Sequence, residues 1–254
     1  DTEIMMALVT RAGHKIVNAI ERADAVIINT CGFIESANEE GIQTILDTAP
    51  LKEIGMLKYL IATGCLAQRY GKELYEEMPE LDAVVGISYF RDINDVLTRV
   101  SKGERVLLVG SPPETFIEKG PRILSTPPGY AYLKIVEGCN NHCSYCTIPS
   151  IRGKLRSRDI SELVDEASIL AQKGCRELVL IAQDTAGYGY DLAGKSLLPE
   201  LLFKLQDVDK IDWIRLLYLH PAHINDDIIA SIASLDKVVP YLDIPIQHVS
   251  TKIL

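Results

Sequence analysis

The chain has 254 residues, of which 47% are hydrophobic and 24% are charged, and its formal net charge is −9 at pH 7. This length and composition are typical of a soluble globular protein with room for two domains, each with its own core. The negative charge argues against broad binding to the phosphate backbone of nucleic acids. Because no run of roughly 18 or more apolar residues is present to span a membrane, and no segment resembles a signal peptide, we expect a cytoplasmic protein without a membrane partner.

The ends of the sequence suggest a piece of a longer protein. The first residue is Asp1 rather than methionine, and the last, Leu254, lies in what reads as the start of a helix. We therefore expect the chain to be truncated at both ends.

The first 120 residues alternate helical and extended patterns. The expected helices begin at Asp1 and span 36–46, 67–78 and 90–100, and the expected strands span 25–29, 57–62, 83–85 and 105–109. Ser36 and Glu39 are spaced as a capping box for the second helix. Strands that alternate with helices favour a doubly wound parallel sheet with helices on both faces.

Two cysteines, Cys31 and Cys65, each follow the end of an expected strand. Because the carboxyl ends of parallel strands meet at one edge of the sheet, the fold should bring these thiols together. They could belong to a metal site, or they could be two buried cysteines that behave as small hydrophobes.

A proline-rich stretch separates the two halves of the chain. Residues 110–129 contain five prolines, which favour extended backbone and are typical of an interdomain linker. We therefore expect two domains, 1–121 and 126–254.

The second half repeats strand and helix in one phase. The expected strands span 130–136, 177–182, 213–219 and 238–244, and the expected helices have Asp159, Ser196 and Asn225 as caps, with Glu162 completing a capping box at the first. Four such units, each with polar residues just past its strand, indicate a partial β/α barrel whose working face is the carboxyl end.

Three cysteines follow the first strand of this half in a C-x3-C-x2-C array, namely Cys139, Cys143 and Cys146. A structural zinc site normally uses four ligands in two close pairs, whereas three thiolates suit a four-iron four-sulfur cluster with one iron open to a small molecule. A zinc site and a ferredoxin-like electron carrier remain alternatives. His142 is interpreted as a solvated loop residue.

Three further features carry weaker expectations. The loop with Gly187, Gly189 and Gly194 departs from G-x-G-x-x-G spacing and is interpreted as a flexible loop beside the substrate. Cys175 is interpreted as a structural thiol. The basic run Arg152, Lys154, Arg156 and Arg158 is typical of a solvated face, although one member could bind a carboxylate.

The C-x3-C-x-aromatic-C pattern, with Tyr145 as the aromatic residue, resembles the radical S-adenosylmethionine (radical SAM) superfamily. The resemblance implies that the open iron binds the amino and carboxylate groups of SAM, that an electron from the cluster cleaves SAM to a radical, and that Tyr145 lies near the adenine.

Five motifs together resemble the methylthiotransferases: NTCGF at 29–33, ATGCLAQRYG at 62–71, EGCNNHCSYCTIPSIRG at 137–153, AQDTAGYG at 182–189 and YLDIPIQHVS at 241–250. The resemblance implies a second, auxiliary four-iron four-sulfur cluster with Cys31 and Cys65 among its three cysteine ligands. The remaining ligand would precede Asp1, and a carboxyl-terminal TRAM domain would follow Leu254. Gln183 and Arg215 would help to hold SAM.

The QDT motif at 183–185 and DIPIQH at 243–248 resemble the RimO branch of that family. This implies transfer of a methylthio group to the β-carbon of an aspartate of ribosomal protein twelve of the small subunit, with two SAM molecules used. The implied partners are that protein or the ribosome, and an electron donor. The alternatives are a MiaB-type enzyme acting on an adenosine of tRNA and a non-enzymatic iron–sulfur electron carrier.

Overall fold

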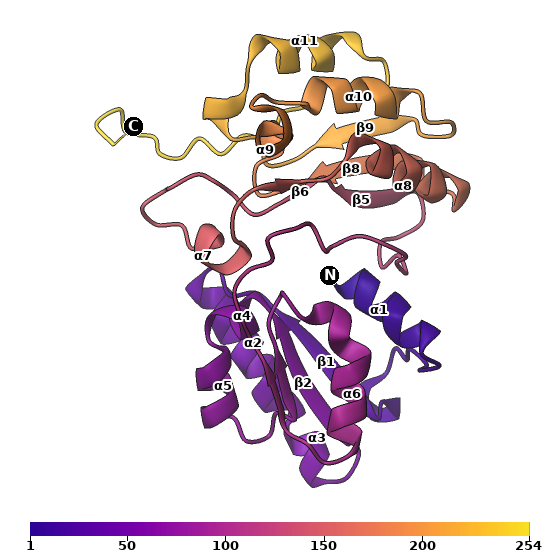
Figure 1. The fold of residues 1–254 in the computed structure, drawn as a ribbon, viewed down its shortest axis with the longest axis vertical. Coiled ribbons are helices and arrows are strands. Elements are labelled where there is room, and N and C mark those ends of the chain that lie inside the picture. The colour runs from indigo at the N-terminus through magenta and orange to yellow at the C-terminus, as the bar shows by residue number, and fades with distance from the viewer. Residues whose placement is uncertain (254) are drawn as a thin grey trace. The chain divides into compact units, whose positions relative to one another are not determined.

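The computed structural model describes residues 1–253, which form two compact units (Figure 1). The first unit comprises residues 1–124 and 142–153, and the second comprises residues 125–141 and 154–254. The segment 142–153 thus groups with the amino-terminal part of the chain. The domain limits expected from the prolines remain a prediction.

A four-stranded parallel sheet forms the centre of the first unit. Its strands follow one another in the order β1 (Ala25–Thr30), β2 (Tyr59–Gly64), β3 (Ala83–Val85) and β4 (Val106–Leu108). Both faces of this sheet are covered, so β2 and β3 are nearly continuous apolar runs. Because successive strand side chains point to opposite faces, Ile61 joins one core while Leu60 and Ala62 join the other.

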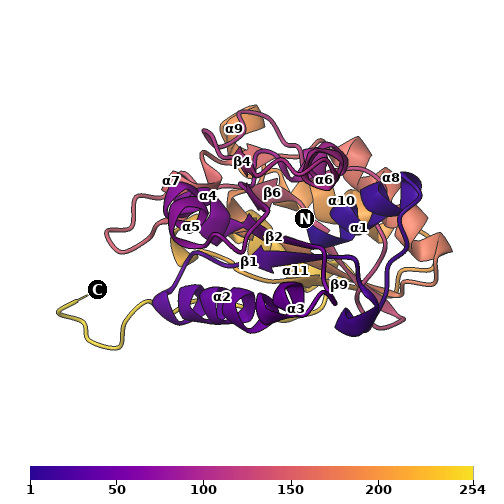
Figure 2. The same cartoon turned by 90° about the horizontal axis from the view of Figure 1, so that it is seen from below.

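Helices of the first unit contribute residues to both of these cores. The helices of this unit are α1 (Thr2–Arg11), α2 (Glu35–Thr48), α3 (Pro50–Glu53), α4 (Cys65–Arg69), α5 (Gly71–Glu77), α6 (Ile93–Ser101) and α7 (Ile148–Arg152), with short 3-10 turns at Ile20–Arg22 and Phe90–Asp92. Residues of α1 and α6 pack in one core, and residues of α2, α4 and α5 pack in the other. Figure 2 shows α2 and α6 on opposite sides of β1 and β2. The expected α/β sheet with helices on both faces is confirmed.

Two local predictions in this unit were wrong. Helix α2 begins at Glu35 with Ile34 at the N-cap and no side-chain cap hydrogen bond, so Ser36 and Glu39 form no capping box. The helix expected over 67–78 is two helices that meet at Tyr70 and Gly71. The break brings Gly71 so close to β4 that a Cβ there would lie 2.4 Å from Val109 Cγ2. A straight helix with a larger residue could not pack in this way.

The second unit contains a parallel sheet of three strands in the order β5 (Tyr130–Lys134), β8 (Glu177–Ile181) and β9 (Trp213–Leu216). Its longer helices are α8 (Ile160–Gln172), α10 (Leu198–Gln206) and α11 (Asp226–Ser234), which contact one another in sequence, α8 with α10 and α10 with α11 (Figure 1). Leu133, Leu178 and Ile214 are fully buried. These repeated parallel units agree with the expected β/α architecture.

The strand expected over 238–244 does not form within residues 1–253. The structure has an isolated bridge between Ile214 and Val238 there. Pro240 follows closely and has no N–H to donate to a ladder, which explains why pairing stops. Asp243 instead accepts hydrogen bonds from the loop after β9, through its side chain from Tyr218 N and through its backbone from Leu219 N.

A two-stranded antiparallel ribbon brackets the cysteine loop and was not expected. It pairs β6 (Val136–Glu137) with β7 (Arg156–Ser157). The expected single strand over 130–136 therefore divides into β5 and β6. The remaining short elements of the second unit are turns at Thr185–Gly187 and Pro221–His223 and the helix α9 (Tyr190–Ala193).

Two of the expected helix caps are confirmed. Asp159 accepts a hydrogen bond from Ser161 N at 2.7 Å, and Asn225 accepts one from Ile228 N at 2.9 Å. Helix α10 begins with Leu197 at the N-cap, and Ser196 Oγ accepts a hydrogen bond from Leu198 N at 3.4 Å. Among residues 1–253 no helix has the length and apolarity that crossing a bilayer requires.

The Asp159 cap should make the stability of the second unit depend on pH. The side-chain hydrogen bond from Ser161 and the backbone hydrogen bond from Ser161 N lower the pKa of Asp159. A lowered folded-state pKa contributes stability above the unfolded-state pKa, and this contribution is lost as pH falls through the folded-state pKa. We expect Asp159→Ala to lower the free energy of unfolding by about 1 kcal/mol at pH 7. The difference from wild type should shrink between pH 5 and pH 2 in urea titrations. A constant difference across that range would contradict this explanation.

Candidate metal centres

The first candidate centre lies at the carboxyl ends of β1 and β2. Thr30 and Gly64 are paired in the parallel register, so Cys31 and Cys65 follow directly at neighbouring positions. A Cβ on Gly32 would lie 2.6 Å from the backbone C and O of Cys65, so the two turns are in direct contact. Arg69 of α4 donates through Nη1 to Gly32 O at 3.0 Å and ties the turns together. The expectation that the fold brings the two cysteines together agrees with this arrangement.

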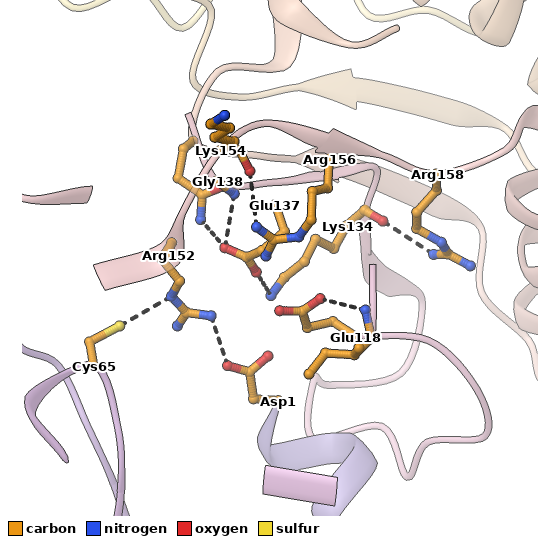
Figure 3. Close-up of polar contacts among 12 residues, drawn as sticks. Asp1, Cys65, Glu118, Lys134, Glu137, Gly138, Arg152, Lys154, Arg156 and Arg158 are labelled. Carbon is orange, nitrogen blue, oxygen red and sulfur yellow. Dashed lines mark hydrogen bonds and ion pairs between the residues drawn. The ribbon is translucent and has the colours of Figure 1, made fainter. Parts of the chain in front are cut away.

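A third residue reaches this centre from a distant part of the sequence. Arg152, at the end of α7, donates through Nε to Cys65 Sγ at 3.2 Å and through Nη1 to Asp1 Oδ2 at 3.0 Å (Figure 3). Helices α4 and α7 are in contact within the first unit. The sequence placed Arg152 in a basic run but gave no sign of its partners, because 87 positions separate Arg152 from Cys65.

The three cysteines of the C-x3-C-x2-C array fall in different compact units. Cys139 is buried in the second unit, where its sulfur accepts a hydrogen bond from Asn141 N at 3.4 Å. Cys143 and Cys146 are half-buried in the first unit, and Cys146 N donates to Cys143 O at 3.0 Å. Their joint action as ligands remains a prediction from their spacing. His142 is exposed, as expected.

The QDT motif ties together several segments of the second unit. Gln183 Nε2 donates to Glu137 Oε1 at 2.6 Å, and Glu137, which is fully buried, also accepts from Lys134 Nζ at 2.6 Å (Figure 3 shows the pair Lys134 and Glu137). Thr185 N donates to Tyr218 O at 2.9 Å. Gln183 is therefore fixed at the carboxyl end of β8 by a buried carboxylate two residues before Cys139.

Asp184, the middle residue of the motif, is a buried carboxylate that the sequence did not single out. It binds Nδ1 of His223, and it accepts hydrogen bonds from His220 N at 3.2 Å and Asn141 Nδ2 at 3.4 Å. The loop after β9 and the start of the cysteine loop are thus held by one side chain. The sequence offered one sign of this role, the position of Asp184 directly after an expected strand, where a side chain can become buried. A buried carboxylate needs hydrogen-bond partners of this kind.

The two other predicted SAM contacts lie in different surroundings. Arg215 of β9 pairs through Nε with Glu177 Oε1 at 2.5 Å and lies 5.6 Å from the centre of the Tyr241 ring. Tyr145 is 72% exposed. Their roles toward SAM remain predictions.

Two of the weaker expectations were wrong. Arg156 and Arg158 are buried rather than solvated, and Arg158 pairs with Glu166 at 2.7 Å. The glycine-rich loop is anchored rather than free, because Tyr188 is fully buried and donates to Arg158 O at 2.7 Å. Burial raises the pKa of Tyr188, which keeps the hydroxyl protonated as this hydrogen bond requires.

Cys175 is buried and its sulfur contacts Glu177 O at 3.1 Å, away from the other cysteines in sequence. This placement agrees with a structural thiol. No disulfide joins any of the six cysteines, all of which lie within residues 1–253.

Comparison with known proteins finds one family model for each half of the chain. Residues 1–86 match the model of an uncharacterized protein family, UPF0004, and residues 133–254 match the radical SAM superfamily. All 254 residues align at 59% identity with a protein of Syntrophomonas wolfei named ribosomal protein uS12 methylthiotransferase RimO. Over its whole length the chain is similar to radical SAM methylthiotransferases.

Other relatives of this chain bear the same RimO name. The identity is 48% to the protein of Clostridioides difficile and 51% to that of Caldanaerobacter subterraneus, in each case over the whole of this chain. The chain spans 57% to 58% of the length of these relatives and of the Syntrophomonas wolfei protein. The names of these relatives agree with the branch expected from the QDT and DIPIQH motifs.

A solved structure resembles this chain in its fold. The radical SAM methyltransferase TsrM from Kitasatospora setae, solved with its tryptophan substrate and a SAM analogue, superposes with a TM-score of 0.57 at 14% identity. The superposition covers 98% of this chain and 52% of that one. At this identity the likeness establishes a shared architecture and no shared substrate.

The donor atoms of this chain fit the groups that its relatives' family implies. Cys31 and Cys65 offer thiols at adjacent strand ends, and the space beside Gly32 leaves no room for a Cβ. Gln183 Oε1 is buried and has no hydrogen-bond partner within the described residues, so it is an acceptor suited to an N–H donor of a bound molecule. Thiolate donors of this kind suit iron–sulfur clusters.

Proposed function

We propose that this chain is the greater part of a cytoplasmic enzyme that adds a methylthio group to the β-carbon of an aspartate of ribosomal protein twelve of the small subunit. The observation that carries the proposal is the 59% identity, over every residue of the chain, to a protein named for that activity. The QDT and DIPIQH motifs support the same branch. Two four-iron four-sulfur clusters and SAM are the cofactors, and an electron donor is a required partner.

Cys139, Cys143 and Cys146 hold the first cluster in this proposal, and its open iron binds SAM. When bound, the cluster and SAM supply the radical that removes hydrogen from the substrate carbon. Tyr145 lies against the adenine, while Gln183 and Arg215 hold polar groups of SAM. The buried pair of Glu137 with Lys134 fixes the amide of Gln183, which leaves Oε1 directed to the ligand.

Cys31 and Cys65 are two ligands of the second cluster, and the contact between Gly32 and Cys65 holds their turns together. Asp184 supports the reaction through the fold. By binding Asn141 and the residues 220 and 223, it ties the cysteine loop to the carboxyl edge of the second sheet. Positions at this edge are where ligands of parallel α/β folds bind.

A tRNA adenosine is the alternative substrate, as in MiaB-type enzymes. The net charge of −9 offers little counterion-release affinity for RNA, and this favours a protein substrate for the part of the enzyme present here. A non-enzymatic electron carrier is a further alternative. An electron carrier does not need a substrate-binding barrel, so the barrel-like second unit with its buried polar edge argues against this alternative.

The test uses the full-length protein reconstituted anaerobically with iron and sulfide, then supplied with SAM, sulfide and a reductant. We expect mass spectrometry to find one methylthio group on the aspartate of a peptide from the ribosomal protein and none on isopentenylated tRNA. Modified tRNA with an unmodified peptide would overturn the branch. Intact SAM after reduction would favour the electron carrier.

A further inference from the structure

Arg152 connects a cysteine sulfur and a carboxylate within the first unit. Its guanidinium donates through Nε to Cys65 Sγ at 3.2 Å and through Nη1 to Asp1 Oδ2 at 3.0 Å. The side chains of Arg152 and Asp1 are 16% and 8% exposed. Hydrogen bonds shielded from water in this way are stronger than exposed ones. Figure 3 shows Nε and Nη1 directed to these two separate partners.

The directions of these hydrogen bonds are fixed at both ends. Asp1 is the N-cap of α1, and its carbonyl accepts from Ile4 N and Met5 N, which holds its position. Arg152 closes α7, where the buried Ile151 and the left-handed Gly153 (φ 81°) set the course of the chain. The guanidinium is a rigid planar fork, so a hydrogen bond to Asp1 orients the Nε–H toward the sulfur.

We propose that Arg152 is a positioning residue for the second cluster. Its Nε–H donates to the Cys65 thiolate when that sulfur is an iron ligand, and the contact raises the reduction potential of the cluster. Reduction adds negative charge, so a hydrogen-bond donor and a positive charge beside a ligand sulfur both stabilise the reduced form. The inference rests on the proposed second cluster and deepens it.

Arg152 also lies close in the sequence to predicted ligands of the first cluster. The segment 142–153 of the first unit carries Cys143 and Cys146, which are predicted ligands of the first cluster, and Arg152 follows Cys146 by six positions. One short segment therefore supplies ligands to one cluster and a hydrogen bond to a ligand of the other.

The test is a redox titration of the full-length protein, reconstituted anaerobically and followed by electron paramagnetic resonance. SAM binds the open iron of the first cluster, so the signal that SAM leaves unchanged belongs to the second. We expect Arg152→Gln to lower the ratio of reduced to oxidised second cluster roughly tenfold at a fixed potential, a shift of about 59 mV for one electron. The potential of the SAM-sensitive signal should not change.

Arg99→Gln is the matched control. It makes the same change of charge in the first unit, on α6, where Arg99 pairs with Glu104 and Asp95 and is remote in sequence from every cysteine. It should leave both potentials unchanged. Arg152→Lys retains the charge without the fork and should recover only part of the shift.

A wild-type potential in Arg152→Gln, with its iron retained, would overturn the inference, and so would an equal shift in Arg99→Gln. If Arg152→Gln loses the second cluster, the potential of that cluster is measured in Arg152→Lys instead. A wild-type potential in Arg152→Lys would then overturn the inference. A wild-type protein without the SAM-insensitive signal would overturn both the inference and the second cluster. A shifted potential in a protein that fails to modify the ribosomal peptide would contradict the proposed substrate and support the role of Arg152.

Discussion

Replacing Cys139, Cys143 or Cys146 with alanine in the full-length protein should abolish reductive cleavage of SAM. A four-iron cluster with three protein ligands that loses one of them has two irons without a thiolate, so it is lost or no longer presents a single open iron. The measurement is the yield of 5'-deoxyadenosine under a low-potential reductant. We expect a fall to the level of the protein without iron.

Cys175→Ala is the matched control for these variants. Cys175 is also buried in the second unit, but its sulfur contacts Glu177 O, and removing it should leave SAM cleavage near the wild-type rate. Circular dichroism should show the first unit folded in every variant, because its two cores contain none of the three cysteines. Cleavage near the wild-type rate in any of the three variants would contradict the proposed ligand set.

The architecture was predictable because it depends on periodicity and on strand order. The runs at 25–30 and 59–64 are apolar and β-branched, so they could be recognised as buried strands, and the parallel register then placed Cys31 beside Cys65. The stretch 238–244 misled the same reasoning. It is apolar enough for a strand, but Pro240 lacks a ladder donor and Asp243 bonds to the loop after β9.

The partners of individual polar side chains were less predictable. Arg156 and Arg158 look solvated in the sequence, yet both are buried, because the ribbon of β6 and β7 turns that part of the basic run inward. Arg152 meets Cys65 across 87 positions. A pattern rule reports which face of an element a residue occupies, whereas such contacts depend on how separate elements pack.

The QDT motif of the second unit shows the same difference: its position was predictable from the sequence, and the hydrogen-bond partners of its side chains were not. The QDT motif could be placed after a strand from the sequence, but the partners of its side chains lie in distant parts of the sequence, and two of the side chains bond to the same loop. Gln183 bonds to Glu137, Asp184 to the cysteine loop and the loop after β9, and Thr185 to the backbone of that loop. Resemblance named Gln183 as a SAM contact, and the structure adds the buried Glu137 that holds it.

Gly32→Ala should remove the second cluster and leave the first. A Cβ at residue 32 would lie 2.6 Å from the backbone C and O of Cys65 and from Leu66 N. These are backbone atoms at the junction of β2 and α4, so relief requires the turn that carries Cys31 to move away from Cys65. Overpacking of this kind costs about 1–3 kcal/mol. The thiols would then no longer sit at the spacing that one cluster requires.

Iron analysis of the reconstituted full-length protein measures this effect. We expect about eight irons in the wild type and about four in Gly32→Ala, with 5'-deoxyadenosine formation retained and methylthio transfer lost. Gly103→Ala is the control, because its Cβ would meet nothing within 4 Å; its positive φ of 84° costs some stability, but iron content should remain that of the wild type. Eight irons in a folded Gly32→Ala protein would show that the two turns need not touch for Cys31 and Cys65 to share a cluster. A fall in iron for Gly103→Ala as well would trace the loss to general destabilisation of the first unit.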